Sequence, residues 1–146
     1  MANPIVLIAE DSHDDFFLIQ RAFRKAEIGA ELKWVKDGSE AKAYLLGQGI
    51  YSDRQEWPMP VLVIADLKMP LMNGFELLSW VRTRPECRRI PYVVLTSSSQ
   101  SPDINRAYDM GANSYLVKPG RFEDLLQMSQ ALKTYWLTLN QSPELS

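Results

Sequence analysis

The sequence has only one cysteine, Cys87, and it has no apolar run long enough to span a bilayer. A single thiol excludes an intrachain disulfide, and a membrane-spanning helix needs about 20 consecutive apolar residues. The first four residues, Met1-Ala2-Asn3-Pro4, lack the charged and apolar segments of a signal peptide. We therefore expect a soluble protein of the reducing cytoplasm that has no membrane partner.

Charge of one sign is not in large excess either. Sixteen basic residues are set against 18 acidic ones, and the formal net charge is -2. Nucleic acids and anionic lipids attract basic surfaces, so neither is an expected partner. The 146 residues, 46% of them hydrophobic, suffice for one compact domain. We expect a single domain over residues 1–146, with its core at about 5–139, a short tail at 140–146 and no output domain.

Four short apolar runs of the sequence each end abruptly on polar residues. The runs and the polar residues that end them are 5–9 with Glu10 and Asp11, 61–65 with Asp66, 92–95 with Thr96, and 115–117 with Lys118. Ligands of open parallel sheets bind outside the carboxyl ends of the strands, where residues far apart in sequence meet. The pattern therefore predicts one shared site built from four strand ends.

Helix-like segments alternate with these strand-like runs along the whole chain. The first helix is expected to begin at Asp14 or Asp15, and a weaker strand is expected at 31–35. Further helices are expected at about 39–46, from 73 to 84, from 102 to 110, and from 122 to 139. Residues 47–60 are typical of a surface loop, with Trp57 as its anchor. Five strand–helix units with right-handed crossovers predict an α/β sandwich of three layers around a parallel sheet.

The residues at the strand ends also form a recognisable set of motifs. The segments are Ile8-Ala9-Glu10-Asp11, Val63-Ile64-Ala65-Asp66-Leu67-Lys68-Met69-Pro70, Asn73-Gly74, Val94-Leu95-Thr96-Ser97 and Tyr115-Leu116-Val117-Lys118-Pro119. In this order they resemble the receiver domain of two-component response regulators, over residues 5 to 139. The resemblance implies a flavodoxin-like, doubly wound sheet of five parallel strands in the order 2-1-3-4-5, with five helices. The ending Tyr135-Trp136-Leu137 is most similar to single-domain regulators that serve phytochrome-type histidine kinases.

The chemistry of these side chains points to phosphoryl transfer. A carboxylate accepts a phosphoryl group only when the repulsion between the two is neutralised, a role that Mg²⁺ commonly has. Glu10, Asp11 and Asp66 offer the oxygen ligands that Mg²⁺, or another divalent cation such as Mn²⁺, prefers. Lys118 offers an ammonium group and Thr96 a hydroxyl to the phosphoryl oxygens. We expect Asp66 to be the phosphoacceptor.

The resemblance implies further roles that the residue types alone do not. It assigns the backbone carbonyl of Lys68 to the metal, and it makes the Lys118–Pro119 peptide bond cis, which would aim Lys118 into the pocket. It also makes Thr96 and Tyr115 a coupled switch, in which Thr96 moves toward the phosphoryl group and Tyr115 turns inward. The output would be a changed surface on the fourth helix, the fifth strand and the fifth helix.

These inferences predict a signalling switch and not a conventional turnover enzyme. The domain would take its phosphoryl group from a sensor histidine kinase, and the resemblance narrows this expected partner to a phytochrome-type kinase. The domain would itself catalyse the transfer and the slow loss of the group. The signal would leave by protein contact, because no DNA-binding output is expected. A downstream phosphotransfer protein, or a homodimer formed through the C-terminal helix region, would receive it.

Other interpretations of the same residues stay open. Glu10 and Asp11 could simply cap the following helix, and Lys118 could be an ordinary exposed lysine. A receiver-like scaffold that binds partners without phosphorylation is the alternative function. An aspartyl phosphatase would need a second Asp where the chain has Lys68, and the acids after the first strand would repel the phosphate of a flavin.

Overall fold

The computed structural model describes residues 3–145 and contains one five-stranded sheet. Its strands are β1 (Ile5–Ala9), β2 (Glu31–Val35), β3 (Leu62–Ala65), β4 (Tyr92–Thr96) and β5 (Ser114–Val117). All neighbours pair in parallel, and the order across the sheet is β2-β1-β3-β4-β5. The expected fold class and strand order are therefore confirmed. The ends of the expected domain, residues 1–2 and 146, lie outside the described residues.

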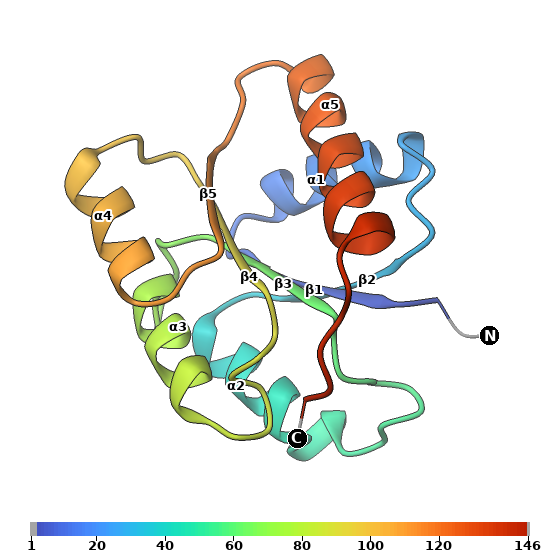
Figure 1. Cartoon of the computed structure of the whole chain (residues 1–146), viewed down its shortest axis with the longest axis vertical. Coiled ribbons are helices and arrows are strands. Elements are labelled where there is room, and N and C mark those ends of the chain that lie inside the picture. The colour runs from blue at the N-terminus through green and yellow to red at the C-terminus, as the bar shows by residue number, and fades with distance from the viewer. Residues whose placement is uncertain (1–2, 146) are drawn as a thin grey trace.

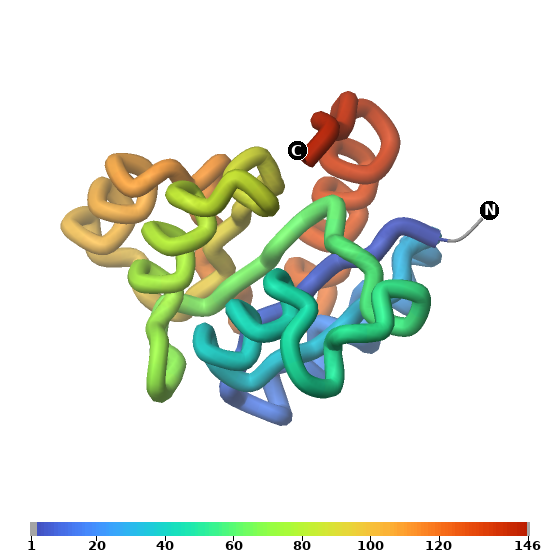
Figure 2. Tube along the Cα trace, turned by 90° about the horizontal axis from the view of Figure 1, so that it is seen from below, coloured from blue at the N-terminus to red at the C-terminus, as the bar shows by residue number. Residues whose placement is uncertain are grey.

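Five α-helices cover the two faces of this sheet (Figures 1 and 2). The helices are α1 (His13–Lys25), α2 (Gly38–Leu46), α3 (Gly74–Thr83), α4 (Ser101–Asp109) and α5 (Phe122–Leu132). Helices α1 and α5 lie together on one face, and α2, α3 and α4 lie on the other. Within residues 3–145, none of these helices combines the length and the apolar character that crossing a membrane requires.

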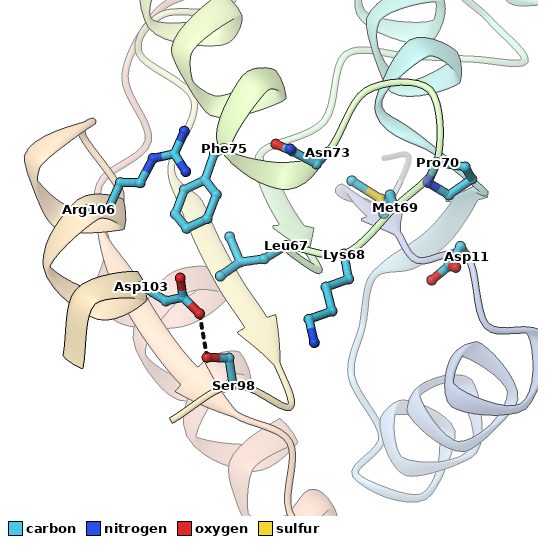
Figure 3. Close-up of a pocket in the computed structure, with 10 residues that line it drawn as sticks. All are labelled: Asp11, Leu67, Lys68, Met69, Pro70, Asn73, Phe75, Ser98, Asp103 and Arg106. Atoms are coloured by element: carbon cyan, nitrogen blue, oxygen red, sulfur yellow. Dashed lines mark hydrogen bonds between the residues drawn. The ribbon is translucent and has the colours of Figure 1, made fainter. Parts of the chain in front are cut away.

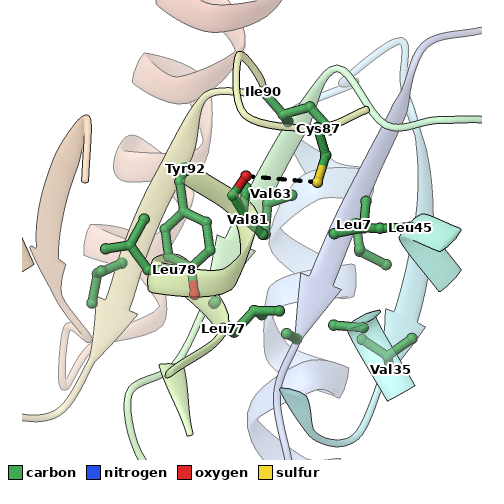
Figure 4. Packing of buried hydrophobic residues seen from close by; sticks show 14 of the residues in the cluster. Leu7, Val35, Leu45, Val63, Leu77, Leu78, Val81, Cys87, Ile90 and Tyr92 are labelled. Atoms are coloured by element: carbon green, nitrogen blue, oxygen red, sulfur yellow. Dashed lines mark hydrogen bonds between the residues drawn. The ribbon is translucent and has the colours of Figure 1, made fainter. Parts of the chain in front are cut away.

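The strands alternate their side chains between two hydrophobic cores, as the period of two in a strand requires. In β1, Val6 and Ile8 face α1 and α5, whereas Leu7 and Ala9 face α2 and α3. Figure 4 shows the second of these cores, where Tyr92 of β4 is fully buried beside the residues of α3. Burial of the sheet on both faces explains why its central strands are continuous apolar runs.

The helix starts are set by side-chain caps. Helix α1 begins at His13 because the Ser12 side chain accepts the backbone N–H of Asp15, so the expected start at Asp14 or Asp15 was wrong by one or two residues. Helix α3 begins after Asn73, which forms a reciprocal capping box with Glu76. Both caps lie directly beside the strand ends and fix the loops that lead from them.

The loop between α2 and β3 is anchored as the sequence indicated. Trp57 lies edge-on to the rings of Tyr44 and Tyr51, the second of which belongs to a short 3-10 helix, Gly49–Tyr51. The Arg54 guanidinium donates to the backbone carbonyls of Tyr44, Leu45 and Trp57. These contacts fasten the loop to the end of α2.

The last helix departs from the expected continuous α-helix. After Leu132 the chain continues as a π-helix, Lys133–Leu139, whose wider turns shift the later side chains around the axis. Trp136 and Leu137 both pack against the core on the α1 side, while Tyr135 remains 55% exposed. Beyond this helix the chain runs down past the sheet to its other side (Figure 1). There the partly buried Leu145 packs against the core that contains residues of α2 and α3.

Candidate functional site

The carboxyl ends of four strands meet at one edge of the sheet and bring the predicted residues together. Ala9 of β1 lies in register with Ala65 of β3, which sets the following Glu10 beside Asp66. The Asp66 backbone N–H donates to the Ala9 carbonyl at 3.0 Å, and the Lys118 N–H donates to the Thr96 carbonyl at 2.8 Å. Backbone hydrogen bonding of the sheet therefore fixes the spacing of the site.

Asp66 lies at the centre of this edge and is only 7% exposed. One of its carboxylate oxygens accepts the Lys118 ammonium at 2.7 Å, and the other accepts the Lys68 backbone N–H at 3.3 Å. Burial alone would raise the pKa of Asp66, but the contacts from Lys118, the Thr96 hydroxyl and the Lys68 N–H outweigh it and lower the pKa below its usual value. The Asp66 carboxylate is therefore ionised at neutral pH.

Glu10 and Asp11 complete a cluster of acids around Asp66. One oxygen from each of the three carboxylates lies within 4.8 Å of the others. Glu10 is buried and Asp11 is exposed at the mouth of the site. Burial raises the pKa of Glu10 to about 7, in spite of the hydrogen bond from Lys118. Three convergent carboxylates with one open side fit a hard cation such as Mg²⁺, which takes oxygen ligands and keeps several waters. The ligand role of the Lys68 carbonyl stays a prediction.

Lys118 connects the cluster to a fourth acid that the sequence interpretation did not place in the site. Its ammonium lies 2.6 Å from Glu10, 2.6 Å from Asp15 and 2.7 Å from Asp66. The side chain is 16% exposed, and these three carboxylates raise its pKa above the ordinary value of lysine even though burial opposes them. Lys118 is therefore a partly buried cation of the site and not an ordinary surface lysine.

The expected cis geometry of the Lys118–Pro119 bond is wrong for this structure. Every peptide bond within residues 3–145 is trans. Trans is the lower-energy form of a bond before proline by about 0.5–1 kcal/mol, and the long lysine side chain reaches its three partners from it. The side chain therefore points into the pocket without the isomer that the resemblance implied.

Thr96 and Tyr115 are joined to the site by the loop that follows β4. The Thr96 side chain is buried, and its hydroxyl contributes to the lowered pKa of Asp66. The Tyr115 hydroxyl donates to the Ser98 carbonyl at 2.8 Å, and the Ser98 hydroxyl donates to Asp103 of α4 at 2.6 Å. A chain of contacts thus runs from the acceptor strand ends to α4.

A surface cavity of about 610 Å³ opens beside the acids (Figure 3). The side chains of Asp11, Lys68 and Arg106 lie around it, and Arg106 also covers the face of Phe75 at 4.1 Å from the ring centroid. Cationic side chains at the mouth of an acidic pocket reduce the repulsion of an anionic ligand. The cavity therefore leaves Asp11 open to solvent beside two positively charged side chains.

Residues 6–130 match the family model described as the response regulator receiver domain. The chain belongs to the response regulator receiver domain family. This match covers β1 from Val6 onward, the other four strands, the three acids, Thr96, Tyr115 and Lys118.

Curated relatives agree with this assignment along almost the whole receiver domain. The chain is 40% identical to the probable methanogenesis regulatory protein FilR2 of Methanothrix harundinacea, over 95% of this chain and 87% of that protein. It is 36% identical to the response regulator Rcp1 of Synechocystis, over 93% of this chain and 92% of that protein.

Solved structures of similar receivers match the whole fold. The response regulator RPA3017 of red light signalling in R. palustris has a TM-score of 0.91 at 32% identity, with 97% of this chain and 99% of that chain covered. The phosphorylated cyanobacterial phytochrome response regulator RcpA has a TM-score of 0.89 at 33% identity, with 98% and 100% covered. The Mn²⁺-bound form of Rcp1 has a TM-score of 0.85 at 35% identity, with 97% and 99% covered. The receiver described here is thus closely similar to phytochrome response regulators.

Proposed function

We propose that this receiver is a phosphorylation-controlled switch in which Asp66 accepts a phosphoryl group from a histidine kinase. The observation that carries the proposal is the position of the Asp66 carboxylate, which is ionised and lies between an acidic cluster and the Lys118 ammonium. Ordinary surface acids lack this combination of burial, neighbouring acids and a partly buried cation.

The residues of the site divide the chemistry between them. One Asp66 oxygen attacks phosphorus, a new oxygen–phosphorus bond forms, and the donor's phosphorus bond breaks with its electron pair leaving on the donor. Lys118 and Thr96 would each bind a phosphoryl oxygen, and their contacts with Asp66 support this role. Glu10, Asp11 and Asp66 would hold Mg²⁺ or Mn²⁺, which supplies positive charge that neutralises the incoming group. Similarity to the Mn²⁺-bound form of Rcp1 supports this cation role.

The output surface would consist of α4, β5 and α5. Attraction of Thr96 to the new phosphoryl group would shift the loop after β4, and Tyr115 and Asp103 would follow because both contact Ser98. On the same surface a groove of about 270 Å³ is lined by Leu116, Met128 and Tyr135, among others. An apolar groove at this position is compatible with two outputs of the proposed switch. One is a homodimer whose stability depends on phosphorylation, and the other is contact with a phosphotransfer protein.

The similarity to phytochrome response regulators supports a phytochrome-type histidine kinase as the donor. A direct test is transfer from a purified, autophosphorylated kinase of this type to the receiver. Faster transfer from a phytochrome-type kinase than from kinases of other sensor classes is the expected result. Equal rates from all kinases would remove the phytochrome assignment and leave the receiver chemistry intact.

The phosphoacceptor itself is tested by intact mass after incubation with acetyl phosphate and Mg²⁺. A single phosphoryl adduct is expected, and it should disappear in Asp66→Asn and in the presence of a chelator. Asp53→Asn is a matched control, because Asp53 is an exposed acid outside the site. If no Asp66-dependent adduct forms with either acetyl phosphate or a kinase, the alternative of a phosphorylation-independent scaffold replaces this proposal.

Self-association is tested separately by sedimentation. The proposal expects the sedimentation coefficient to rise when a phosphoryl mimic and Mg²⁺ are added, because the apolar residues around Tyr135 would become buried between two copies. Equal profiles with and without the mimic would exclude the dimer as the output.

A further inference from the structure

Asp15 forms an ion pair with Lys118 but has no role in the proposed phosphoryl transfer. It lies in the first turn of α1, outside the acids that could share a cation, and its side chain is 40% exposed. Its carboxylate nevertheless lies 2.6 Å from the Lys118 ammonium, as close as the buried Glu10. The contact joins residues 103 positions apart in the sequence and links α1 to the end of β5.

We propose that Asp15 is a positioning residue. It holds the Lys118 ammonium beside the acceptor when Glu10 and Asp66, the other two partners of Lys118, bind a cation. This inference rests on the proposed phosphoryl transfer to Asp66. It assigns a function to a side chain that the transfer chemistry and the metal cluster both leave unexplained.

The Lys118 ammonium group has three hydrogens to donate. In the resting site each can be directed at one carboxylate, since Lys118 contacts Glu10, Asp15 and Asp66 at nearly equal distances. Glu10 and Asp66 are also the two buried members of the candidate cation site. A cation bound there would draw their oxygens toward itself and would repel the ammonium.

Asp15 is the partner that such a cation would leave free to keep its contact. No other residue that lines the groove beside Lys118 could take over the contact of Asp15, because the remaining lining residues are apolar. They are Leu18, Ile19, Leu95, Pro119 and Leu125. Among residues 3–145, the carboxylates of Glu10, Asp15 and Asp66 are the only acids within salt-bridge distance of Lys118. Without Asp15, the ammonium of the cation-bound site would therefore lose its fixed anchor.

The anchor itself is held in place by the helix start. The Asp15 backbone N–H donates to the Ser12 side chain, and α1 continues from this cap over two further turns. Placement on a capped helix gives the carboxylate a defined direction that a loop residue would lack. Asp14, the preceding residue, belongs to the same turn but its side chain is 99% exposed and does not contact Lys118.

The test compares the maximal rate of Asp66 phosphorylation by acetyl phosphate at saturating Mg²⁺ among variants. Asp15→Ala is expected to slow this rate about tenfold, which corresponds to about 1.4 kcal/mol in the barrier. Asp14→Ala removes the same charge from the same turn and should leave the rate unchanged. Asp15→Glu should recover part of the loss, because it restores a carboxylate on a longer side chain.

Two further measurements separate positioning from a general effect of charge or folding. The Mg²⁺ concentration that gives half the maximal rate should not rise in Asp15→Ala, whereas loss of a cation-attracting charge would raise it. In a Lys118→Met background, Asp15→Ala should no longer change the residual rate, because Asp15 acts through Lys118. Circular dichroism melting of each variant shows whether the fold is retained. Asp15→Asn removes the charge but keeps the shape of the side chain, so it should slow the rate as Asp15→Ala does.

The outcomes distinguish this inference from the proposal on which it rests. An unchanged or faster rate in Asp15→Ala overturns the positioning role, as does an equal loss in Asp14→Ala or a persistent loss in the Lys118→Met background. If the unmodified protein itself forms no Asp66-dependent adduct, the proposed phosphoacceptor fails instead.

Discussion

Gly74, the first residue of α3, is predicted to be a glycine that the fold cannot replace without cost. A Cβ atom added there would lie 2.2 Å from the Asp66 carbonyl oxygen and 2.8 Å from the Leu67 Cα. The Gly74 N–H also donates to the Leu67 carbonyl, and its own carbonyl accepts the buried Tyr92 hydroxyl. Gly74→Ala therefore has to displace backbone on both sides of the acceptor.

The magnitude follows from two opposing effects. Alanine is favoured over glycine inside a helix by up to about 1 kcal/mol, so a change without a clash would stabilise the protein. Overfilling a close-packed site typically costs about 1–3 kcal/mol, and here the added Cβ would lie 2.2 Å from a backbone oxygen, well inside the 3.0 Å that real Cβ contacts keep. We expect the free energy of unfolding to fall by about 1–3 kcal/mol, and phosphorylation of Asp66 to slow because its backbone shifts.

Urea unfolding followed by fluorescence measures the first effect, and intact mass with acetyl phosphate measures the second. Gly29→Ala is the matched control, because a Cβ there has no neighbour within 4 Å, and it should leave stability and phosphorylation nearly unchanged. If Gly74→Ala were as stable as the unmodified protein, the close approach of α3 to Asp66 would not constrain this position, and the reasoning would be refuted.

Three further predictions concern the loop after α2, the thiol and the cation. Arg54→Ala should lower the free energy of unfolding by about 1–3 kcal/mol in urea titrations, because three backbone carbonyls lose a charged donor. Cys87 should react with a thiol reagent at pH 8 only after unfolding, since burial raises its pKa to about 11 and fewer than about one thiol in 100 is then ionised; rapid labelling of the native protein would contradict this. Mg²⁺ should raise the melting temperature, chelator should reverse the rise, and Asp11→Ala should abolish it; an equal rise in Asp11→Ala would argue against the cluster.

The parts of the site that the sequence predicted are those fixed by parallel-sheet geometry. Each of Glu10, Asp66 and Lys118 directly follows the last residue of a strand, and Thr96 is the last residue of β4. Because parallel strands end at one edge, their order along the chain was enough to bring them together. The local signals of strand end and turn therefore carry most of the information about the site.

The parts that the sequence did not predict depend on contacts between distant segments or on competing local signals. Asp15 follows another acid at a helix start, where acids are common, and its partner lies in the last third of the chain. The start of α1 was expected at Asp14 or Asp15, but Ser12 forms the cap, and the sequence could not decide between them because serine and aspartate are equally good N-cap residues. The π-helix after Leu132 could not be predicted from the spacing of apolar residues. The apolar residues of 122–139 fit the period of 3.6 of an α-helix, and this pattern does not reveal where the turns widen.

The charges of the site explain why the proposed switch would need both a cation and Lys118. Glu10, Asp15 and Asp66 surround a single ammonium, and Asp11 adds a fourth carboxylate at the rim of the site. This excess of negative charge would repel an incoming phosphoryl group, whatever the geometry of the acceptor. In the proposed function a divalent cation would reverse the balance on the side of Asp11, and Lys118 would do so on the side of Asp15. Asp66 lies between the two, so its phosphorylation would depend on both.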